Sequence, residues 1–341
     1  MIKKLFVLVA ALCLLCSCAT NADQSRSAGE NLNKTVGISL PDLTWGDHAT
    51  QLTRQLEKAG YQVFVEYAGG DMQLQYSQVQ TLVNMPVGCL VVAAVDSMAL
   101  GDVLSANVPV IAFDRMLMYT DAVTGCVGLD SYAAGQLAGQ HIAQEKQLET
   151  AQAPVSIEFF MGAPENHNSF LFYQGVMSQL QPYLHSGVLQ CRSGRTAFED
   201  ACIQPETVEM ASDRCFDYLT SYYEQDAPDV LCAATDALAN GCINALTSFA
   251  LEPSAEDWPL ITGAGATEEG LQNLADGYQS ITVHTDGNAL VEQCVLRVQA
   301  AVEGKPLADG TAFNGVADVP ACLLEPTLVD KDNYKDFLPE E

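Results

Sequence analysis

An acid and a base stand side by side at the end of a short apolar run, V-P-V-I-A-F-D-R, from Val108 to Arg115. The run has the composition of a strand that is buried on both faces of a parallel sheet. Arg115 is the only Lys or Arg between Lys58 and Lys146. Ligands of parallel α/β sheets bind at the carboxyl ends of the strands. Asp114 and Arg115 therefore offer acceptors and donors to a hydroxyl-rich ligand, and the alternative interpretation is a structural ion pair that closes the strand.

Predicted strands and helices alternate along the chain and must position this pair. The strands are expected at residues 35–40, 61–67, 89–95, 108–114, 122–129, 155–161, 188–192, 230–234, 260–263, 281–284 and 323–329. The helices are expected at residues 47–59, 71–83, 96–106, 131–144, 168–184, 205–223, 237–250, 268–275 and 289–302. This alternation implies an α/β fold with parallel sheets and right-handed crossovers. About eleven strands favour two doubly wound, Rossmann-like lobes over one open sheet, and a TIM barrel would need eight even repeats.

Each predicted lobe draws on two segments of the chain. Residues 35–129 and 286–317 are assigned to the N-terminal lobe, and residues 130–285 and 318–341 to the C-terminal lobe. No long Pro- or Ser-rich linker separates two halves of the sequence. The short crossings between these segments therefore predict a hinge of several segments rather than a tether.

The formal net charge of -28 comes from 43 acidic against 15 basic residues. Such a surface repels phosphate backbones, so we expect no binding of DNA or RNA. The length of 341 residues suits about two domains.

Residues 1–18 have the pattern of an export signal, with two lysines before the apolar run Leu5–Leu15. This run is too short to span a bilayer comfortably as a permanent helix. The sequence L-C-S-C that ends at Cys18 resembles the lipobox of bacterial lipoproteins, which predicts a lipidated Cys18 as the first mature residue. The alternative is an ordinary signal peptide that is cut slightly later. Residues 19–34 are polar and aperiodic, as a flexible tether would be.

Motifs for catalysis and for metal binding are weak in this sequence. The nine cysteines that follow Cys18 contain no C-x-x-C pair, and the five histidines show no H-x-x-x-H spacing. There is no calcium-loop pattern and no nucleophile elbow. Gly263, Gly265 and Gly270 fit a tight strand-to-helix turn better than a dinucleotide-binding loop. We therefore expect no metal, no cofactor and no enzyme activity.

Four segments together resemble one known family. They are V-G-I-S-L-P from Val36, V-I-A-F-D-R from Val110, G-A-P-E-N-H-N-S-F-L-F-Y from Gly162, and N-G-V-A-D-V-P-A-C-L-L-E-P from Asn314. In order and spacing they are similar to the type I periplasmic sugar-binding proteins of ABC importers. The xylose and multiple-sugar receptors are the nearest relatives by this measure, and the ribose-binding protein is more distant. The resemblance covers about residues 35–338.

The resemblance implies roles for several polar residues. Asp114 and Arg115 match the family's Asp-Arg pair, which grips adjacent sugar hydroxyls by charge-assisted hydrogen bonds. Asn168 matches the second Asn of the family's Asn-Asn-Ala motif. Asp236 matches an acidic residue at a strand end of the second lobe.

Other positions depart from the family's pattern or have a competing explanation. Trp45 matches an aromatic residue that stacks on the sugar, and the alternative is a side chain of the core. His284 stands where relatives usually carry Lys. Residues 264–265 replace a family Gln-Asp pair, so we expect weaker binding of xylose and glucose than in relatives. A second family aromatic falls on Ile203, and Phe198 is the alternative aromatic residue for that role.

The resemblance implies a lipoprotein anchored through Cys18 on the extracytoplasmic face of the cell membrane, in the periplasm or at the cell surface. It would capture a monosaccharide or related sugar between two lobes, as a monomer, and deliver it to an ABC permease. The alternative is a sugar-sensing module that docks on a membrane kinase or chemoreceptor. A LacI-type regulator shares the fold but needs an N-terminal helix-turn-helix, and here an export signal occupies that place.

Overall fold

The computed structural model describes residues 34–104, 107–224, 226–249, 257–307 and 310–338, so the predicted signal peptide with Cys18 and residues 19–33 of the predicted tether lie outside it. The described chain forms two compact units with interleaved segments. Unit 1 contains the described residues up to Phe113, together with Leu117–Cys126 and Val291–Ala321. Unit 2 contains Asp114–Met116, Val127–Leu290 and the described residues from Cys322 onward.

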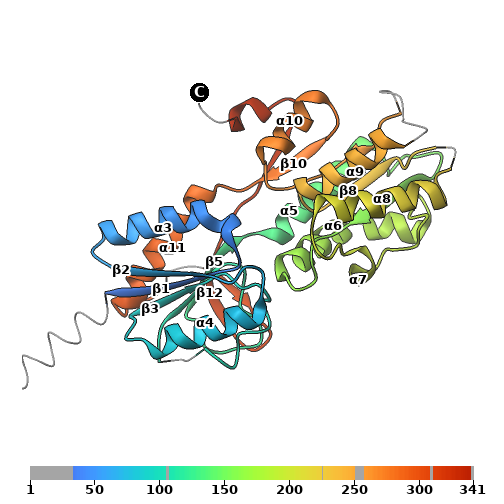
Figure 1. The fold of residues 1–341 in the computed structure, drawn as a ribbon. Coiled ribbons are helices and arrows are strands. Elements are labelled where there is room, and N and C mark those ends of the chain that lie inside the picture. Colours follow the sequence, from blue (N-terminus) through green and yellow to red (C-terminus); the bar gives the residue numbers. More distant parts are fainter. Residues whose placement is uncertain (1–33, 105–106, 225, 250–256, 308–309, 339–341) are drawn as a thin grey trace, which may run out of the picture. The chain divides into compact units, whose positions relative to one another are not determined.

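A seven-stranded sheet is centred on unit 1, with the strand order β11-β12-β5-β4-β3-β1-β2. Its strands are β1 (Thr35–Leu40), β2 (Gln62–Tyr67), β3 (Cys89–Val92), β4 (Val110–Asp114), β5 (Gly125–Leu129), β11 (Gly310–Phe313) and β12 (Asp318–Leu324). β1 to β4 pair in parallel, and β11 pairs with β12 in antiparallel fashion. Helices α3 (Gly46–Lys58) and α11 (Gly287–Val302) lie on one face and α4 (Met72–Asn84) on the other (Figure 1). The central strands are apolar because both faces are covered.

Unit 2 contains a four-stranded parallel sheet and a two-stranded antiparallel sheet. The first has the order β7 (Leu189–Gln190), β6 (Val155–Phe160), β8 (Val230–Ala233), β9 (Leu260–Ile261), and the second joins β10 (Ile281–His284) to β13 (Thr327–Asp330). The helices are α5 (Ser131–Glu145), α6 (His167–Ser186), α7 (Phe198–Ala201), α8 (Val208–Tyr222), α9 (Asp236–Ser248) and α10 (Glu268–Asp276). α5 packs against α6, and α8 packs against α9 (Figure 1).

Glycines bring α5 and α6 into backbone contact. A Cβ at Gly135 would overlap the carbonyl oxygen of Phe172, and one at Gly175 would overlap the carbonyl oxygen of Tyr132. The predicted helix at 131–144 is confirmed, and its small residues permit this crossing. Because interiors are close-packed, a side chain at either glycine would force the helices apart.

The predicted helix at 96–106 is wrong, because the described part of this segment contains only turns. The Asp96 side chain accepts a hydrogen bond from the Met98 amide at 2.8 Å, and the Val103 amide donates to the Leu100 carbonyl at 3.2 Å. Such local side-chain bonds compete with a helical backbone, and Gly101 weakens the helix further.

Among the other differences from the sequence-based boundaries, two have a clear local cause. The helix predicted from residue 205 begins at Val208, because the Thr207 hydroxyl caps it by accepting from the Met210 amide at 3.2 Å. The single strand predicted at 323–329 is two strands, β12 and β13, which stop and restart around Pro326. Proline has no N–H to donate to a sheet, so the ladder breaks there.

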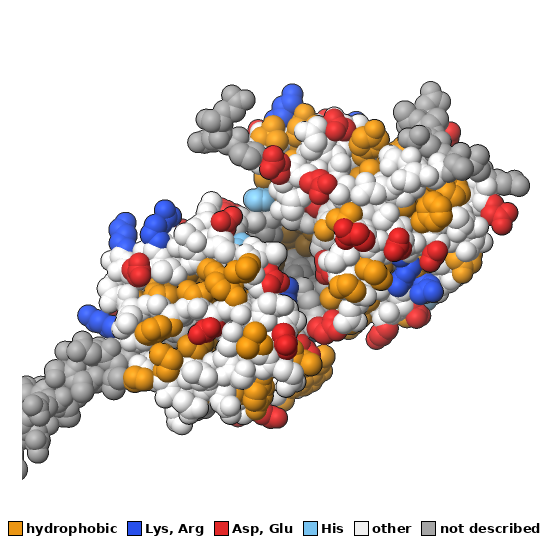
Figure 2. Space-filling model, in the orientation of Figure 1, with side chains coloured by type: hydrophobic (Ala, Val, Ile, Leu, Met, Phe, Trp, Pro, Cys, Tyr) orange, Lys and Arg blue, Asp and Glu red, His pale blue; other side chains and the backbone are white. Residues whose placement is uncertain are grey.

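The surface reflects the excess of acidic residues. On the face displayed in Figure 2, Asp and Glu side chains are scattered widely and Lys and Arg side chains are few. Among the described residues, no helix combines the length and the apolar character that a membrane crossing requires.

Candidate functional site

Three aromatic rings of unit 1 meet where β1 and β4 end. Trp45 ends the 3₁₀ helix η1 (Leu43–Trp45), His48 lies in the first turn of α3, and Phe113 lies near the end of β4. The ring centroids are 5.7 Å apart for Trp45 and His48, 6.0 Å for His48 and Phe113, and 6.0 Å for Trp45 and Phe113. Phe113 is fully buried, whereas Trp45 and His48 are partly exposed. We call Trp45, His48 and Phe113 the aromatic corner.

The local sequence explains the aromatic corner. The Asp42 side chain accepts a hydrogen bond from the Thr44 amide at 2.8 Å, which starts η1 directly after β1. Residues three apart lie on the same face of a helix, so Trp45 and His48 point the same way. The apolar run of β4 places Phe113 beneath them. Sequence reasoning selected Trp45 and missed His48, although its spacing from Trp45 was a usable signal.

Asp114 and Arg115 follow Phe113 and are both largely buried. The Arg115 Nε lies 3.9 Å from an Asp114 carboxylate oxygen. Asp114 has a φ of 63°, in the left-handed region that Asp tolerates better than most residues. Gly128 makes room for this conformation, because a Cβ there would lie 2.7 Å from the Asp114 carbonyl oxygen. The pair is therefore held in a specific backbone geometry where the strand ends.

The structure brings Asn168 next to Asp114. The Asn168 Nδ2 donates a hydrogen bond to the Asp114 carbonyl oxygen at 3.2 Å. Asn168 lies in the first turn of α6, where the Asn166 side chain accepts from its backbone amide at 3.1 Å. These two predicted site residues, 54 positions apart in the sequence, therefore form one polar group.

Asp236 begins α9 and is 2% exposed. One carboxylate oxygen accepts from the Gln279 amide nitrogen at 2.9 Å and the Thr282 hydroxyl at 2.7 Å. The other accepts from the backbone amide of Thr267 at 2.8 Å and from its hydroxyl at 3.0 Å. A carboxylate has about four lone-pair sites, so these bonds occupy them all. We call Asp236, Thr267, Gln279 and Thr282 the Asp236 network.

Two glycines complete the Asp236 network. A Cβ at Gly263 or at Gly270 would overlap the Asp236 carboxylate. Gly263 and Gly265 lie in the turn that joins β9 to α10, as the sequence predicts, whereas Gly270 lies in the first turn of α10 itself. Asp236 remains a predicted ligand residue, but its oxygens would have to exchange one of these internal bonds to reach a sugar.

His284 lies at the end of β10, where the backbone pairs with Thr327 of β13. Its ring packs edge-on against Phe337 of the 3₁₀ helix η2 (Tyr334–Phe337), with centroids 4.9 Å apart. Burial lowers the pKa of His284, and the nearby Asp286 carboxylate opposes this shift. The imidazole therefore favours its neutral form.

Phe198, the alternative to the second family aromatic, is part of the hydrophobic core of unit 2. Phe198 is 8% exposed, and its ring packs on Phe170 at 5.2 Å and on Tyr173 at 5.4 Å. Ile203 is 1% exposed. Unit 2 therefore offers no open aromatic platform at either position.

Acidic residues also gather where β6 ends, and sequence reasoning missed them. The Glu206 side chain accepts from the Ala163 amide at 3.1 Å, and the Gln204 side chain donates to Glu165. Ala163 and Glu206 are separated by 43 positions, so no local pattern could have linked them. Among the described residues, no group of three or more His, Cys, Asp or Glu side chains is arranged to hold a metal ion.

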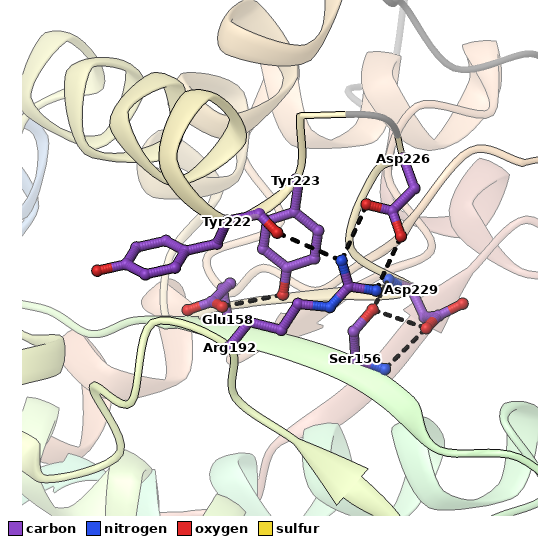
Figure 3. Close-up of polar contacts among 7 residues, drawn as sticks. All are labelled: Ser156, Glu158, Arg192, Tyr222, Tyr223, Asp226 and Asp229. Atoms are coloured by element: carbon purple, nitrogen blue, oxygen red, sulfur yellow. Dashed lines mark hydrogen bonds and ion pairs between the residues drawn. The ribbon is translucent and has the colours of Figure 1, made fainter.

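A second buried carboxylate, Glu158 of β6, lies among the contacts that Figure 3 shows. The Tyr223 hydroxyl donates to it at 2.9 Å, the Ser193 hydroxyl at 2.5 Å and the Ser193 amide at 3.0 Å. Burial raises the pKa of Tyr223, and burial together with Glu158 raises the pKa of Cys191 to about 11. Cys191 and Cys202 form no disulfide. This group ties β6 to the loop after β7 and to the end of α8.

Arg192 extends the Glu158 group toward the surface. Its guanidinium makes two hydrogen bonds to Asp226, at 2.9 and 2.8 Å, and lies 4.5 Å from the centre of the Tyr223 ring (Figure 3). The bonds to Asp226 raise the pKa of Arg192. All of these contacts are internal, so we assign the Glu158 group a structural role.

Comparison with known proteins identifies the fold that carries these residues. Residues 41–306 match a family model described as periplasmic binding protein domain. The multiple sugar-binding periplasmic receptor ChvE of Rhizobium radiobacter is 32% identical over 316 residues, which cover 90% of this chain and 89% of that protein. The D-xylose-binding periplasmic protein of Escherichia coli (strain K12) is 28% identical over 310 residues, which cover 88% of each chain.

A solved structure is similar over nearly the whole fold. An ABC transporter solute-binding protein from Clostridium phytofermentans with bound β-D-glucose is 34% identical, with a TM-score of 0.84. The match covers 90% of this chain and 97% of that one. The predicted α/β fold of type I periplasmic binding proteins is confirmed, and so is the expectation of no enzyme, because these relatives are receptors and binding proteins. The chain is therefore a member of the periplasmic binding protein domain family.

Proposed function

We propose that this protein is an extracytoplasmic solute-binding lipoprotein that captures a monosaccharide and delivers it to an ABC permease. The observation that carries the proposal is the 34% identity to a glucose-bound solute-binding protein over 90% of the chain. The names of two further relatives, a multiple sugar-binding receptor and a D-xylose-binding protein, point to the same class of ligand.

The residues that the family resemblance selects are proposed to bind the sugar. Trp45 supplies an indole face, which suits the C–H face of a pyranose ring. Asp114 and Arg115 supply acceptors and donors to adjacent hydroxyls, and charged partners make such bonds stronger than neutral ones. Asn168, bonded to the Asp114 carbonyl, sets the position of the pair and adds a further polar group. Asp236 and His284 stay in the proposed set with lower accessibility, because the protein already engages both.

A thermal-shift screen of the purified protein against aldohexoses and aldopentoses tests the binding step. A ligand that binds only the folded state stabilises it by about 2.7 kcal/mol at a hundred times its Kd. We expect a rise in Tm with at least one sugar, with D-glucose and D-xylose tested first. The replacement at 264–265 predicts that these two bind more weakly than in relatives. The absence of a Tm shift with every sugar of the panel, at sugar concentrations up to about 50 times a millimolar Kd, would refute a sugar-binding function.

Anchoring through Cys18 is a separate proposal, supported by the lipobox-like run that precedes it. Cys18→Ser should move the protein from the membrane fraction to the soluble fraction. Cys16→Ser is the matched control, because it leaves the predicted lipidated residue in place. A wild-type protein found in the soluble fraction would contradict the anchor.

Delivery to a permease and sensing both begin with the same binding event. A relative is described as a receptor, which keeps the sensing role as the second candidate. Uptake of the radiolabelled ligand by cells that lack this protein discriminates the two roles. Loss of uptake supports transport, whereas normal uptake with a lost transcriptional response supports sensing. We propose that the protein acts as a monomer in either role, which sedimentation of the purified chain would check.

A further inference from the structure

His48 occupies a position that its packing alone does not explain. The imidazole lies 5.7 Å from the Trp45 ring and 6.0 Å from the Phe113 ring, centroid to centroid. These are ordinary distances for aromatic packing, which a Phe would satisfy equally well. The polar nitrogens of the ring are therefore the feature that needs a role.

Within the part of the chain that the structure describes, His48 has ring contacts and no hydrogen bond or ion pair. Its side chain is partly exposed, so the nitrogens have access to solvent or to a ligand. A neutral imidazole carries one N–H donor and one acceptor nitrogen. A hydroxyl group is also both donor and acceptor, and either nitrogen suits it.

His48 lies at the edge of the sheet where a parallel fold of this kind is expected to bind its ligand. The aromatic corner lies at the carboxyl ends of β1 and β4, and Asp114 and Arg115 come directly after Phe113. Parallel sheets bind their ligands at this edge. Phe113 forms the buried floor, and Trp45 and His48 are the two partly exposed rings above it. A flat, hydroxyl-rich ring that rests on Trp45 would direct a peripheral hydroxyl toward the neighbouring imidazole.

We propose that His48 is a ligand-contacting, specificity-determining residue: one nitrogen of its imidazole hydrogen-bonds a hydroxyl of a sugar ring that stacks on Trp45. This inference rests on the proposed sugar-binding function. It assigns to unit 1 a hydrogen-bonding imidazole next to Trp45, and it selects for ligands that carry a hydroxyl at that edge.

The test uses the tryptophan content of the chain. Trp45 and Trp258 are its two tryptophans, so Trp258→Phe makes Trp45 the sole reporter. The emission of this parent is titrated with D-glucose and with D-xylose. The same titrations are run with His48→Phe, which keeps an aromatic ring, and with His48→Gln, which keeps a donor and an acceptor. His185→Phe is the control, because His185 is exposed on α6 of unit 2.

We expect His48→Phe to weaken binding about 3- to 10-fold, the value of one neutral hydrogen bond. His48→Gln should recover part of this loss, and His185→Phe should match the parent. The decisive measurement repeats the titrations with monodeoxy analogues of the sugar. The analogue that lacks the contacted hydroxyl should bind the parent and His48→Phe equally well, because the bond is absent from both complexes.

The outcomes separate the two proposals. Equal affinities of the parent, His48→Phe and His48→Gln for every sugar and analogue overturn the role of His48 and leave the sugar-binding function intact. No response of the parent to either sugar, with no thermal shift across the panel, overturns the function and the inference with it. If His48→Phe fails to fold by circular dichroism, the comparison of His48→Gln with the deoxy analogues decides the question.

Discussion

The aromatic corner of unit 1 and the Asp236 network of unit 2 both lie at carboxyl ends of parallel strands, yet they differ in how their polar atoms are used. In the Asp236 network, four donors from Thr267, Gln279 and Thr282 surround one carboxylate. In the aromatic corner, His48 has ring contacts and, among the described residues, no hydrogen bond. The carboxylate of the Asp236 network is fully hydrogen-bonded within the protein, whereas the His48 ring nitrogens of the aromatic corner are not bonded to any residue that the structure describes.

The difference teaches that a position at a strand end does not by itself make a ligand residue. A buried carboxylate must satisfy its lone pairs, and the chain can do so with its own donors. Asp236 does this and orders the turn from β9 to α10. A partly exposed imidazole does not need a hydrogen-bond partner from the protein, so its nitrogens are available to a ligand. The state of the polar atoms, rather than the residue type, separates the two cases.

Removal of the acceptor at the centre of the Asp236 network should have the largest effect. Asp236→Ala leaves buried donors without an acceptor, each at a cost of about 1–3 kcal/mol, and we expect a loss of about 3–5 kcal/mol in the free energy of unfolding. Urea denaturation measures this loss. Asp217→Ala on the exposed face of α8 is the control and should change stability by less than about 0.5 kcal/mol. A loss below about 1 kcal/mol for Asp236→Ala would show that the network is dispensable.

Arg115→Ala addresses the pair that follows the aromatic corner. We expect a folded protein whose sugar affinity falls at least tenfold, because one charge-assisted bond contributes roughly 1.5–3 kcal/mol and tenfold corresponds to about 1.4 kcal/mol. Calorimetric titration measures the affinity. The exposed Arg54 of α3 supplies the control variant, Arg54→Ala. Unchanged affinity in Arg115→Ala, with reduced stability, would make Asp114 and Arg115 a structural ion pair.

Tyr223→Phe removes one hydrogen-bond donor from the Glu158 carboxylate, whereas Asp236→Ala removes an entire acceptor group. The Glu158 carboxylate keeps both of its bonds from Ser193 in this variant, so we expect a smaller loss of about 0.5–1.5 kcal/mol. Urea denaturation at neutral pH is again the measurement. The neighbouring exposed Tyr222 offers the control Tyr222→Phe. A loss as large as that of Asp236→Ala would mean that single donors, and not the acceptor, dominate such networks.

The smallest expected effect is a pH dependence from His284. Burial lowers its folded-state pKa below the ordinary value of 6.5, so the folded state binds fewer protons than the unfolded state in this range. Stability is therefore highest above about pH 6.5 and falls as the pH drops through 6.5 toward the lower folded pKa. His141 and His167 have the same direction of shift, again through burial. His284→Phe should reduce the loss of stability between pH 7.5 and 5.5, and an unchanged loss would assign it to the other histidines.

Local patterns predicted most of the elements well. The strands that became β1, β4, β6 and β10 have the expected places because continuous apolar runs admit few alternatives. The errors fall where a side chain competes with the backbone, as Asp96 does, or where a strand is short and exposed, as β11 is. β11 has little apolar signal because most of its residues face solvent.

The candidate site likewise contains residues that the sequence predicted and contacts that it did not predict. Sequence similarity and strand-end position selected Trp45, Asp114, Arg115 and Asn168, and the structure places Asn168 against the Asp114 carbonyl. The engagement of Asp236 by Thr267, Gln279 and Thr282 involves partners 31, 43 and 46 positions away. No local sequence pattern predicts such contacts, because a polar residue on those elements has the same sequence neighbours whether or not it bonds Asp236.

The sequence by itself determined the class of fold and the family, because alternating apolar runs and a few spaced motifs depend on neighbours in the chain. It also determined the acidic surface and the strand-end position of the Asp-Arg pair. Only the tertiary structure decided which polar side chains are already bonded within the protein. Hydrogen bonding depends on distance and direction between elements far apart in sequence, and those are set by packing. For that reason Asp236 and His48, which both lie in the first turn of a helix, differ in whether their polar atoms are hydrogen-bonded within the protein.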